Sequence, residues 1–346
     1  MRIAVLAGGL SPEHDVSMKS GCGIAAALAG AGHTVALCDI MRDVSAQEYA
    51  RYSGRTDYEH TIPDEPYDVD AHRCELTCGS LTGEGLIPFL RQADLVFMAL
   101  YGGMGEDGRA QALLDCYGIG YTGGDSRACH LAMDKYLTKL IFSGAGIGTP
   151  DGILYDGTQP RSVIDAVGLP AVVKPRSNGS SIGVHFAYTR EELNEAIEKS
   201  SIGDGLIIEE LIVGREFTVS VLCDTALPVV EIIPHGGAFD FKSKYTAGMT
   251  DEICPAPIDK NTADTLCMLA LKAHNVLGLR ECSRTDFIMS EDGTIYALET
   301  NALPGMTPTS LMPLAAAAEG IDYTGLCERI CAAALERIKN DRNDRH

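Results

Sequence analysis

The sequence predicts an α/β protein whose first part is an open parallel sheet. A short apolar run, residues 3–7, leads directly into a glycine turn, as a buried strand does. A second run, residues 94–100 (DLVFMAL), is almost wholly apolar, which is typical of a strand covered on both faces. Helix-like segments alternate with these runs, and this alternation indicates parallel strands that bind ligands at their carboxyl ends.

The first unit is expected over residues 1–125. Its elements are a strand at 3–7, a small-residue helix at 17–28, strands at 34–40 and 94–100, and a helix at 110–117. Residues 41–80 have weak periodicity, so we expect a surface excursion there. The turn after the first strand is AGGLSPEHD, which lacks the G-x-G-x-x-G fingerprint of dinucleotide-binding proteins. A nicotinamide oxidoreductase is discounted for this reason.

Two further units are expected, over residues 126–213 and 214–346. The middle unit has helices at 133–146 and 191–199 and strands at 171–174 and 205–211. The last unit has strands at 215–222 and 227–233, a long loop, helices at 262–277 and 322–339, and a hairpin before the final helix.

The amino-acid composition limits which binding partners and which cellular compartment are expected. The net charge of −20 disfavours nucleic acid and anionic membranes as partners, because an acidic surface is repelled by both. No apolar run of about 18 residues and no signal peptide is visible, so a cytoplasmic location is expected. The 12 cysteines are scattered, which favours free thiols over a disulfide framework; a metal site at His72, Cys74 and Cys78 is the disfavoured alternative.

The stretch 284–307 carries the strongest chemical signal. Asp292-Gly293 predicts a hairpin, and a two-residue loop there would place Asp286 opposite Glu299 and Arg284 opposite Asn301. A four-residue loop over 290–293 shifts the pairing by two positions but leaves the same side chains on one face. The other face would carry four apolar residues: Phe287, Met289, Tyr296 and Leu298.

The polar face of this hairpin suits a hard metal ion. Opposed carboxylates on neighbouring strands repel each other unless cations lie between them. Carboxylate oxygens from Asp286 and Glu299, with the carbonyl oxygen of Asn301, are ligands that suit Mg²⁺ rather than zinc. The alternative is a solvated face with ordinary surface charges.

Lysines beside flexible segments suggest an anion site. Lys174 ends a strand before RSNGSSIGV, where Gly179 and Gly183 allow backbone N–H groups to approach an anion. Lys135 and Lys244 also lie beside such segments or on short polar helices, and each could equally be a surface residue. Convergence of the three with the carboxylates would form a nucleoside triphosphate pocket.

The ordered set of motifs resembles the D-alanine:D-alanine ligase family of the ATP-grasp superfamily. It covers nearly the whole chain outside residues 41–80. The segments that carry the resemblance are AVLAGGLSPEHDVS, GGMGEDGRAQALLD, MDKYLTK, VVKPRSNGSSIGV, IIEELIVGREFTVSVL, KSKYTAG and RTDFIMSEDGTIYALETNALPGMTPTSLMP. The implied architecture is an ATP-grasp fold, α+β in its ATP-binding part, behind the N-terminal parallel-sheet domain.

The resemblance implies a reaction and a nucleotide site. ATP phosphorylates the carboxylate of a first D-alanine, and the amine of a second attacks the acylphosphate. Phosphoryl transfer between anions demands cations and positioning above all. The implied nucleotide residues are Lys135 and Lys174 for the α- and β-phosphates, Lys244 for the γ-phosphate, Glu209 and the Ile212 backbone for adenine, and Glu216 for ribose. The implied metal ligands are Asp286, Glu299 and Asn301, holding two Mg²⁺ or Mn²⁺.

The resemblance also implies the amino-acid site. Arg284 and the Gly305 backbone N–H would stabilise the tetrahedral oxyanion, and Ser310 with the Leu311 backbone would hold the second carboxylate. Glu13 would bind the first ammonium. A chain from Glu13 through Ser180 to Tyr245 would close a lid formed by residues 236–252, because an acylphosphate exposed to water is hydrolysed.

Three positions depart from the family pattern. Tyr101 stands where many members have a histidine that is thought to help place the first substrate. Glu210 stands where a lysine is frequent, which suggests that only the backbone is used there. Asn301-Ala-Leu-Pro-Gly305 replaces Asn-Thr/Ser-x-Pro-Gly but keeps the asparagine and the glycine.

Several functional alternatives stay open at this point. Tyr245 favours D-alanine as second substrate over D-lactate or D-serine. A ligase that joins other amino acids would keep the nucleotide site and change Glu13, Tyr245 and Ser310. A catalytically idle nucleotide-binding module would have lost a metal ligand or a phosphate lysine. The resemblance further implies peptidoglycan precursor synthesis in the bacterial cytoplasm, a homodimer, and K⁺ as an activator.

Overall fold

The computed structural model describes residues 1–52, 54–63, 67–69, 71, 81–159, 164–177, 179, 183–200, 203–235 and 250–343. Its first sheet is parallel, with the order β2-β1-β3. These strands are β1 (Arg2–Ala7), β2 (Thr34–Asp39) and β3 (Leu95–Met98), and β1 pairs with both of the others in parallel. The prediction of an N-terminal parallel sheet is therefore confirmed.

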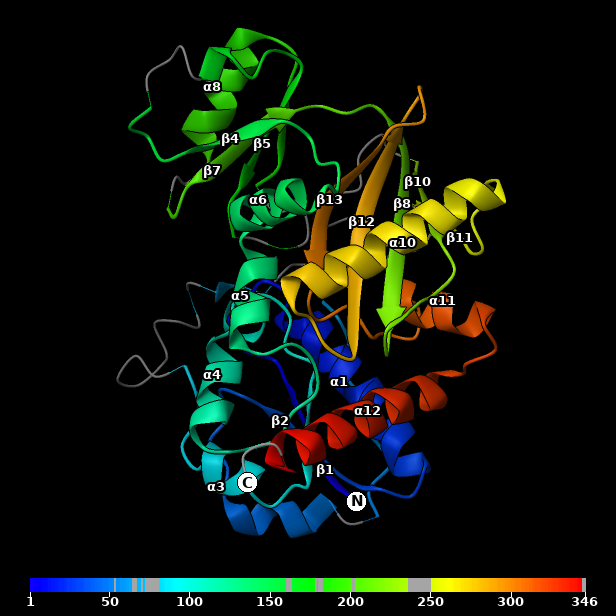
Figure 1. Ribbon diagram of the computed structural model, residues 1–346. Helices are drawn as coiled ribbons and strands as arrows, with labels where there is room; N and C mark the ends of the chain where they lie inside the picture. The colour runs from blue at the N-terminus through cyan, green and yellow to red at the C-terminus, as the bar shows by residue number, and fades with distance from the viewer. Residues whose placement is uncertain are drawn as a thin grey trace.

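Both faces of the first sheet are covered, which explains its uninterrupted apolar strands. Ile3 and Val5 contribute to a cluster shared with α1 (His14–Gly30), α11 (Leu311–Ala318) and α12 (Tyr323–Asn343). Ala4 and Leu6 contribute to a second cluster on the other face, with α3 (Leu86–Leu90) and α4 (Arg109–Cys116). The C-terminal helix thus packs beside the N-terminal sheet, as Figure 1 shows.

A small antiparallel sheet forms the upper part of the molecule in Figure 1. Its order is β4-β7-β5-β6, and the strands are β4 (Gly152–Tyr155), β5 (Ala171–Pro175), β6 (His185–Ala187) and β7 (Leu206–Glu210). Helix α8 (Arg190–Lys199) packs on this sheet and begins with a capping box formed by Thr189 and Glu192.

A third, antiparallel sheet lies between the other two (Figure 1). Its main order is β11-β10-β8-β12-β13, with β9 paired to β8. The strands are β8 (Gly214–Leu222), β9 (Thr225–Ala226), β10 (Val230–Pro234), β11 (Thr250–Ile253), β12 (Cys282–Ser290) and β13 (Ile295–Asn301). One face packs against α5 (Ser126–Met133), α6 (Lys135–Ala145) and α10 (Lys260–Leu277).

The three sheets fall within the ranges 1–125, 126–213 and 214–346, but helices cross between them. Helices α5 and α6 share the apolar cluster of the third sheet, and α12 shares that of the first. The exact domain boundaries remain a prediction.

The β12–β13 hairpin has the expected pairing at one end only. Arg284 pairs with Asn301 and Asp286 with Glu299, as the two-residue loop predicted. Beyond Asp286 the register shifts, so that Phe287 pairs with Ala297. A β-bulge inserts one extra residue into β13 and reverses its alternation on the side nearer the turn.

The bulge corrects the predicted apolar face. Phe287 and Met289 lie in the third-sheet cluster as expected, but their partners there are Ala297 and Ile295 instead of Leu298 and Tyr296. The turn itself places the Ser290 N–H 3.0 Å from the Thr294 carbonyl oxygen, so neither predicted loop length is found.

Other expected elements also differ. The helix predicted over 133–146 begins at Lys135, because Asp134 has extended backbone and accepts the N–H groups of Tyr136 and Leu137 as an N-cap. Within residues 41–80, predicted as a surface excursion, Tyr49 and Tyr58 are buried. Tyr58 donates a hydrogen bond to the Val35 carbonyl oxygen, so part of this segment belongs to the core. His72, Cys74 and Cys78 lie outside the described residues.

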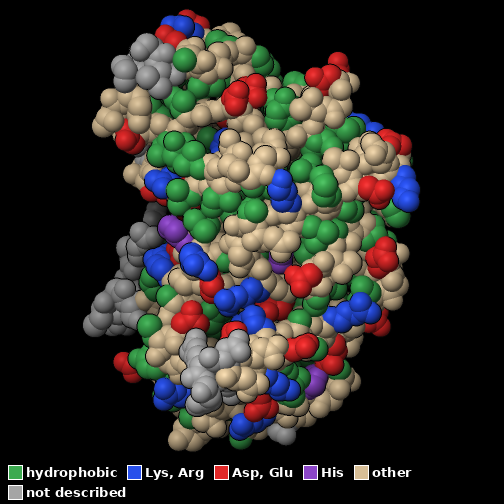
Figure 2. All heavy atoms as spheres, in the orientation of Figure 1, with side chains coloured by type: hydrophobic (Ala, Val, Ile, Leu, Met, Phe, Trp, Pro, Cys, Tyr) green, Lys and Arg blue, Asp and Glu red, His purple; other side chains and the backbone are tan. Residues whose placement is uncertain are grey.

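The surface mixes charges of both signs. Figure 2 shows acidic and basic side chains interspersed over the face drawn there. Within the described part of the chain, none of the helices has both the length and the apolar character needed to cross a membrane. All ten cysteines that the structure describes are free thiols.

Candidate active site

The polar face of the β12–β13 hairpin joins four of the predicted residues. Arg284 donates to Asp286 from both Nε (2.9 Å) and Nη2 (3.0 Å). Asn301 Nδ2 lies 3.2 Å from Asp286 Oδ2, and Thr218 on the neighbouring strand donates to Oδ1 at 2.6 Å. The carboxylates on this face are therefore held by cationic and polar groups, as their opposed charges require.

Lys135 meets this face from the start of α6. Its ammonium lies 3.2 Å from the Glu299 carboxylate. The cap residue Asp134 also binds the Arg176 guanidinium, with Nε at 2.8 Å, and the Lys135 N–H donates to the Arg176 carbonyl oxygen at 3.1 Å. The start of α6 is thus tied to the segment that follows β5 and Lys174.

Glu209 on β7 lies between two lysines. Lys174 Nζ is 2.5 Å from Glu209 Oε1, and Lys139 Nζ is 2.6 Å from Oε2. Burial by itself would raise the pKa of the Glu209 carboxyl, but Lys174 and Lys139 outweigh it, so the pKa lies below its ordinary value. Burial and the charge of Lys174 lower the pKa of Lys139, against the opposing effect of Glu209.

The remaining predicted adenine and ribose residues lie close by along the chain. Ile212 is half-buried in the link between β7 and β8, and Glu216 is half-buried on β8, opposite Ile232. The Glu210 carboxylate accepts the Asp151 N–H at 2.9 Å, so its side chain serves the backbone here.

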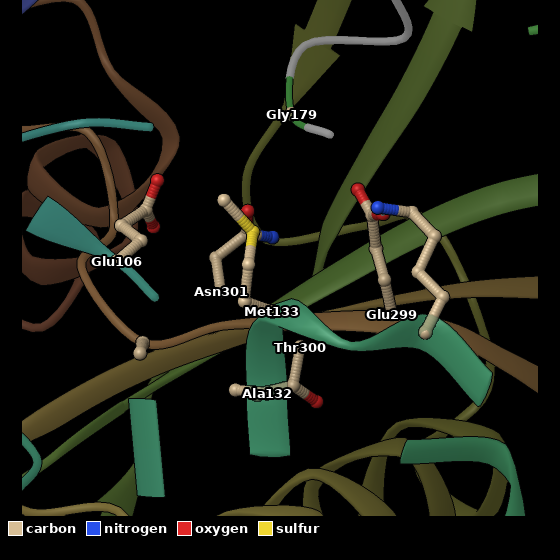
Figure 3. Close-up of a pocket in the computed structure, with 9 residues that line it drawn as sticks. Glu106, Ala132, Met133, Gly179, Glu299, Thr300 and Asn301 are labelled. Carbon is tan, nitrogen blue, oxygen red and sulfur yellow. The ribbon is translucent and has the colours of Figure 1, made fainter. Parts of the chain in front are cut away.

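A small cavity lies where the start of α6 meets the polar face of the hairpin (Figure 3). Its lining residues are Glu106, Ala132, Met133, Lys135, Gly179, Glu299, Thr300, Asn301 and Ala302. Figure 3 shows the side chains of Glu299 and Asn301 directed toward Gly179, whereas that of Thr300 points the other way, as strand alternation requires. Carboxylate and amide oxygens at this edge form a donor set that suits Mg²⁺. Among the described residues, no group of three or more His, Cys, Asp or Glu side chains that could hold a metal ion is found.

Glu13 approaches the same region from the loop before α1. A Cβ atom on Gly179 would lie 2.8 Å from Glu13 Oε2, so only a glycine permits this approach. Burial and the charge of Glu13 raise the pKa of the Glu106 carboxyl to about 8. Two carboxyl groups, Glu13 and Glu106, therefore lie near each other at the side of the cavity that faces the first sheet.

The loop before α11 carries the remaining predicted groups. Ser310 is the N-cap position of α11, and its hydroxyl accepts the Thr307 N–H at 3.0 Å. Leu311 is the first residue of that helix. A Cβ atom on Gly305 would lie 3.1 Å from Ser310 Oγ, so this glycine allows close packing. Tyr101 Oη accepts a hydrogen bond from the Met306 N–H at 2.9 Å.

The comparisons with known proteins point to one family, and together they cover nearly the whole chain. A family model described as D-ala D-ala ligase N-terminus matches residues 2–124, and one described as D-ala D-ala ligase C-terminus matches residues 154–332. The chain is 38% identical to a D-alanine--D-alanine ligase of Pediococcus pentosaceus, over 95% of this chain and 96% of that one. It is also 38% identical to one of Halalkalibacterium halodurans, over 97% and 100%. The chain belongs to the D-alanine–D-alanine ligase family.

Solved structures of family members share its fold. The D-alanine--D-alanine ligase of Bacillus anthracis aligns with a TM-score of 0.77 at 29% identity, over 99% of both chains. The same enzyme complexed with ATP aligns with a TM-score of 0.75 at 26% identity. The predicted family and the predicted ATP-grasp fold with an N-terminal parallel sheet are confirmed.

Of the predicted family residues, Lys135, Glu299 and Asn301 line the cavity, and Arg284 and Asp286 pair beside them on the hairpin. Lys174 and Glu209 form a separate buried ion pair on the small sheet. Ser180, Lys244 and Tyr245 lie outside the described residues, so their roles stay predictions. Two site residues were missed. Lys139 lies one helical turn after Lys135, a spacing that places both on one helix face. Glu106 lies in the quoted motif GGMGEDG, where an acidic residue before a glycine could have been singled out.

Proposed function

We propose that this protein joins two D-alanine molecules into D-alanyl-D-alanine at the expense of ATP, through an acylphosphate. The observation that carries the proposal is that Arg284, Asp286, Glu299 and Asn301 meet at the paired end of one hairpin. The Lys135 ammonium reaches Glu299 there, and Lys135, Glu299 and Asn301 line one cavity. Opposed carboxylates surrounded by cations are what transfer of a phosphoryl group to a carboxylate requires, since anions must be brought together.

The nucleotide would lie between the small sheet and the third sheet. Lys135 and Lys174 would bind the α- and β-phosphates, and Lys244 the γ-phosphate. Glu209 and the Ile212 backbone would bind adenine, and Glu216 the ribose. The two lysines on Glu209 keep its carboxylate ionised and oriented, so that it can accept hydrogen bonds.

Asp286, Glu299 and Asn301 would hold two Mg²⁺ or Mn²⁺, which when bound would neutralise charge on the transferred phosphate. Arg284 and Lys135 supply positive charge at the same carboxylates. These side chains would exchange part of their present pairing for the phosphates and the metal as ATP binds.

A further set of predicted residues would bind the two amino acids. Glu13 would bind the ammonium of the first D-alanine. Arg284 and the Gly305 N–H would stabilise the oxyanion, and Ser310 with the Leu311 backbone would bind the second carboxylate. Ser180 and Tyr245 would extend Glu13 into a chain that closes residues 236–252 over the site and excludes water.

The biological setting follows from this chemistry. We propose a cytoplasmic bacterial homodimer in peptidoglycan precursor synthesis, with K⁺ as an activator. D-Alanine is the proposed second substrate, and D-serine or D-lactate are the alternatives, since pockets discriminate weakly against such isosteres.

The first experiment is mass spectrometry of the products formed with ATP, Mg²⁺ and equal D-alanine, D-serine and D-lactate, with L-alanine as control. D-Alanyl-D-alanine should dominate, and chelation should abolish it until Mg²⁺ or Mn²⁺ is restored. Arg284→Met should lower turnover by about 10²–10³-fold, whereas the exposed Arg190→Met should not.

Other products would revise the proposal in defined ways. A mixed product would overturn the assignment of the second substrate. ADP release without a dipeptide would indicate another acceptor, and absence of ATP turnover would indicate an idle nucleotide-binding module.

A further inference from the structure

We propose that Tyr101 and Glu106 are positioning residues that hold the backbone N–H of Gly305 in its place. Both belong to the loop that follows β3, outside the third sheet. This inference rests on the proposed function, in which that N–H stabilises the oxyanion. It assigns a task to the loop 101–106, which follows β3 and contributes no predicted catalytic group.

Two side chains of this loop meet the backbone on either side of Gly305. Tyr101 Oη accepts the Met306 N–H at 2.9 Å, and this contact is buried. The Leu303 N–H faces the Glu106 carboxyl and opposes the rise in its pKa. Leu303 and Met306 bracket Pro304-Gly305, so both ends of the dipeptide lie against one loop, which binds the Met306 end directly.

The backbone carbonyl oxygen of Met306 is hydrogen-bonded as well. Tyr323 at the start of α12 donates its hydroxyl proton to the Met306 carbonyl oxygen. Both backbone polar groups of Met306 are thus bound by tyrosine hydroxyls, one from the loop after β3 and one from α12. Met306 is 3% exposed, so loss of either bond would leave a buried polar group unpaired.

The same loop also lies against Glu13. Gly102 has φ 67°, and a Cβ atom there would lie 2.3 Å from Ser11 Oγ and 2.9 Å from Glu13 Oε2. Glu106 Oε2 accepts the Gly102 N–H at 2.7 Å, which stiffens the loop. The same loop therefore lies against both the residue proposed for the first ammonium and the segment that carries the N–H proposed for the oxyanion.

This arrangement predicts a kinetic signature that differs from that of a substrate contact. A misplaced donor acts on the transition state, since small displacements of catalytic groups can cost about 100-fold in rate. Tyr101→Phe should therefore lower kcat by about 10- to 100-fold. KM for ATP and for D-alanine should stay within about twofold, because Tyr101 acts through Met306 and not on the substrate.

The experiment pairs these kinetics with amide hydrogen exchange of the peptide that contains Met306. Exchange in Tyr101→Phe should be about three- to tenfold faster, as expected for loss of one hydrogen bond. Tyr58→Phe is the matched control, since it removes a hydroxyl-to-backbone bond at β2, far along the chain from the site. Its kcat and its exchange at Met306 should equal those of the wild type.

A second variant, at Glu106, keeps the proposal testable if Tyr101→Phe does not fold. Glu106→Ala removes the acceptor of the Gly102 N–H, so it should also lower kcat with KM unchanged and speed exchange at Gly102. A raised KM for D-alanine at normal kcat would overturn the inference in favour of direct substrate contact. Faster exchange at normal kcat, or no change in either, would also overturn it. Turnover is followed as ADP release with the acceptor that the wild type uses, so an unexpected dipeptide would overturn only the proposed substrate.

Discussion

At the scale of single residues, Glu106 has the most perturbed environment at the cavity. Burial and the nearby Glu13 raise the pKa of its carboxyl to about 8, while the N–H groups of Gly102 and Leu303 and the charge of Arg284 oppose the rise. At a pH between 4.5 and about 8, the folded protein therefore keeps a proton on the Glu106 carboxyl. The unfolded chain, in which this carboxyl has its ordinary pKa of 4.5, has released that proton.

The direction of this pKa shift predicts how the stability of the protein changes with pH. The folded state binds more protons than the unfolded state between pH 4.5 and about 8, so this carboxyl makes the protein less stable as the pH rises through that window. Glu106→Gln carries no such titration. The melting temperature of the wild type should fall by several degrees relative to Glu106→Gln between pH 5 and pH 8. Parallel melting curves for the two proteins would contradict the raised pKa.

At the scale of elements, the junction between α5 and α6 organises the phosphate side of the site. Asp134 caps α6 and binds Arg176, so one carboxylate positions the helix that begins with Lys135 and the segment that follows Lys174. The sequence predicted a helix over 133–146 and none over 126–133, so it missed α5 and the cap at Asp134 that separates the two helices.

Asp134→Ala should remove both functions of this carboxylate. Loss of the cap and of the ion pair is expected to lower the free energy of unfolding by about 2 kcal/mol and to raise KM for ATP. Urea denaturation and ATP titration of turnover measure the two effects. Asp134→Asn can still cap the helix, so it should keep most of the stability while raising KM. Equal KM values for the three proteins would sink the idea that the ion pair positions the lysines.

The hairpin shows what element-level patterns leave open. Period-2 alternation and Asp292-Gly293 correctly predicted that Asp286 faces Glu299 and that Arg284 faces Asn301. The bulge beyond Asp286 brings Ala297 into the core in place of Leu298. Ala297 packs there in a cluster shared with α5, α6 and α10, and no local turn signal contains that packing.

At the scale of the whole molecule, ion pairs join segments far apart in the chain. Glu281 accepts hydrogen bonds from the Gly123 N–H at 2.6 Å and from Arg337 Nε at 2.7 Å. Arg337 on α12 also donates to the Tyr121 carbonyl oxygen at 2.8 Å. The first sheet, the strand that begins the hairpin and the C-terminal helix thus meet at one buried carboxylate.

Arg337→Met would leave the Glu281 carboxylate, 3% exposed at its side chain, without its cation. Breaking a buried pair from one side costs about 3 kcal/mol or more, so we expect a loss of that size in the free energy of unfolding. Chemical denaturation tests this, with Arg329→Met as the control, because Arg329 is an exposed arginine on the same helix. A loss no larger than that of the control would show that the tie contributes little.

Several features of this protein could be predicted from its amino-acid sequence alone. The parallel N-terminal sheet, the family, and the meeting of Arg284, Asp286, Glu299 and Asn301 follow from apolar periodicity, motif order and strand alternation, all of which are local in the chain. Tertiary structure decided which groups meet across the chain: Lys139 with Glu209, Tyr101 with Met306, Glu106 with Leu303, and Glu281 with Arg337. Such contacts depend on how separate sheets pack, because buried charges and N–H groups need partners that only the folded chain brings within reach.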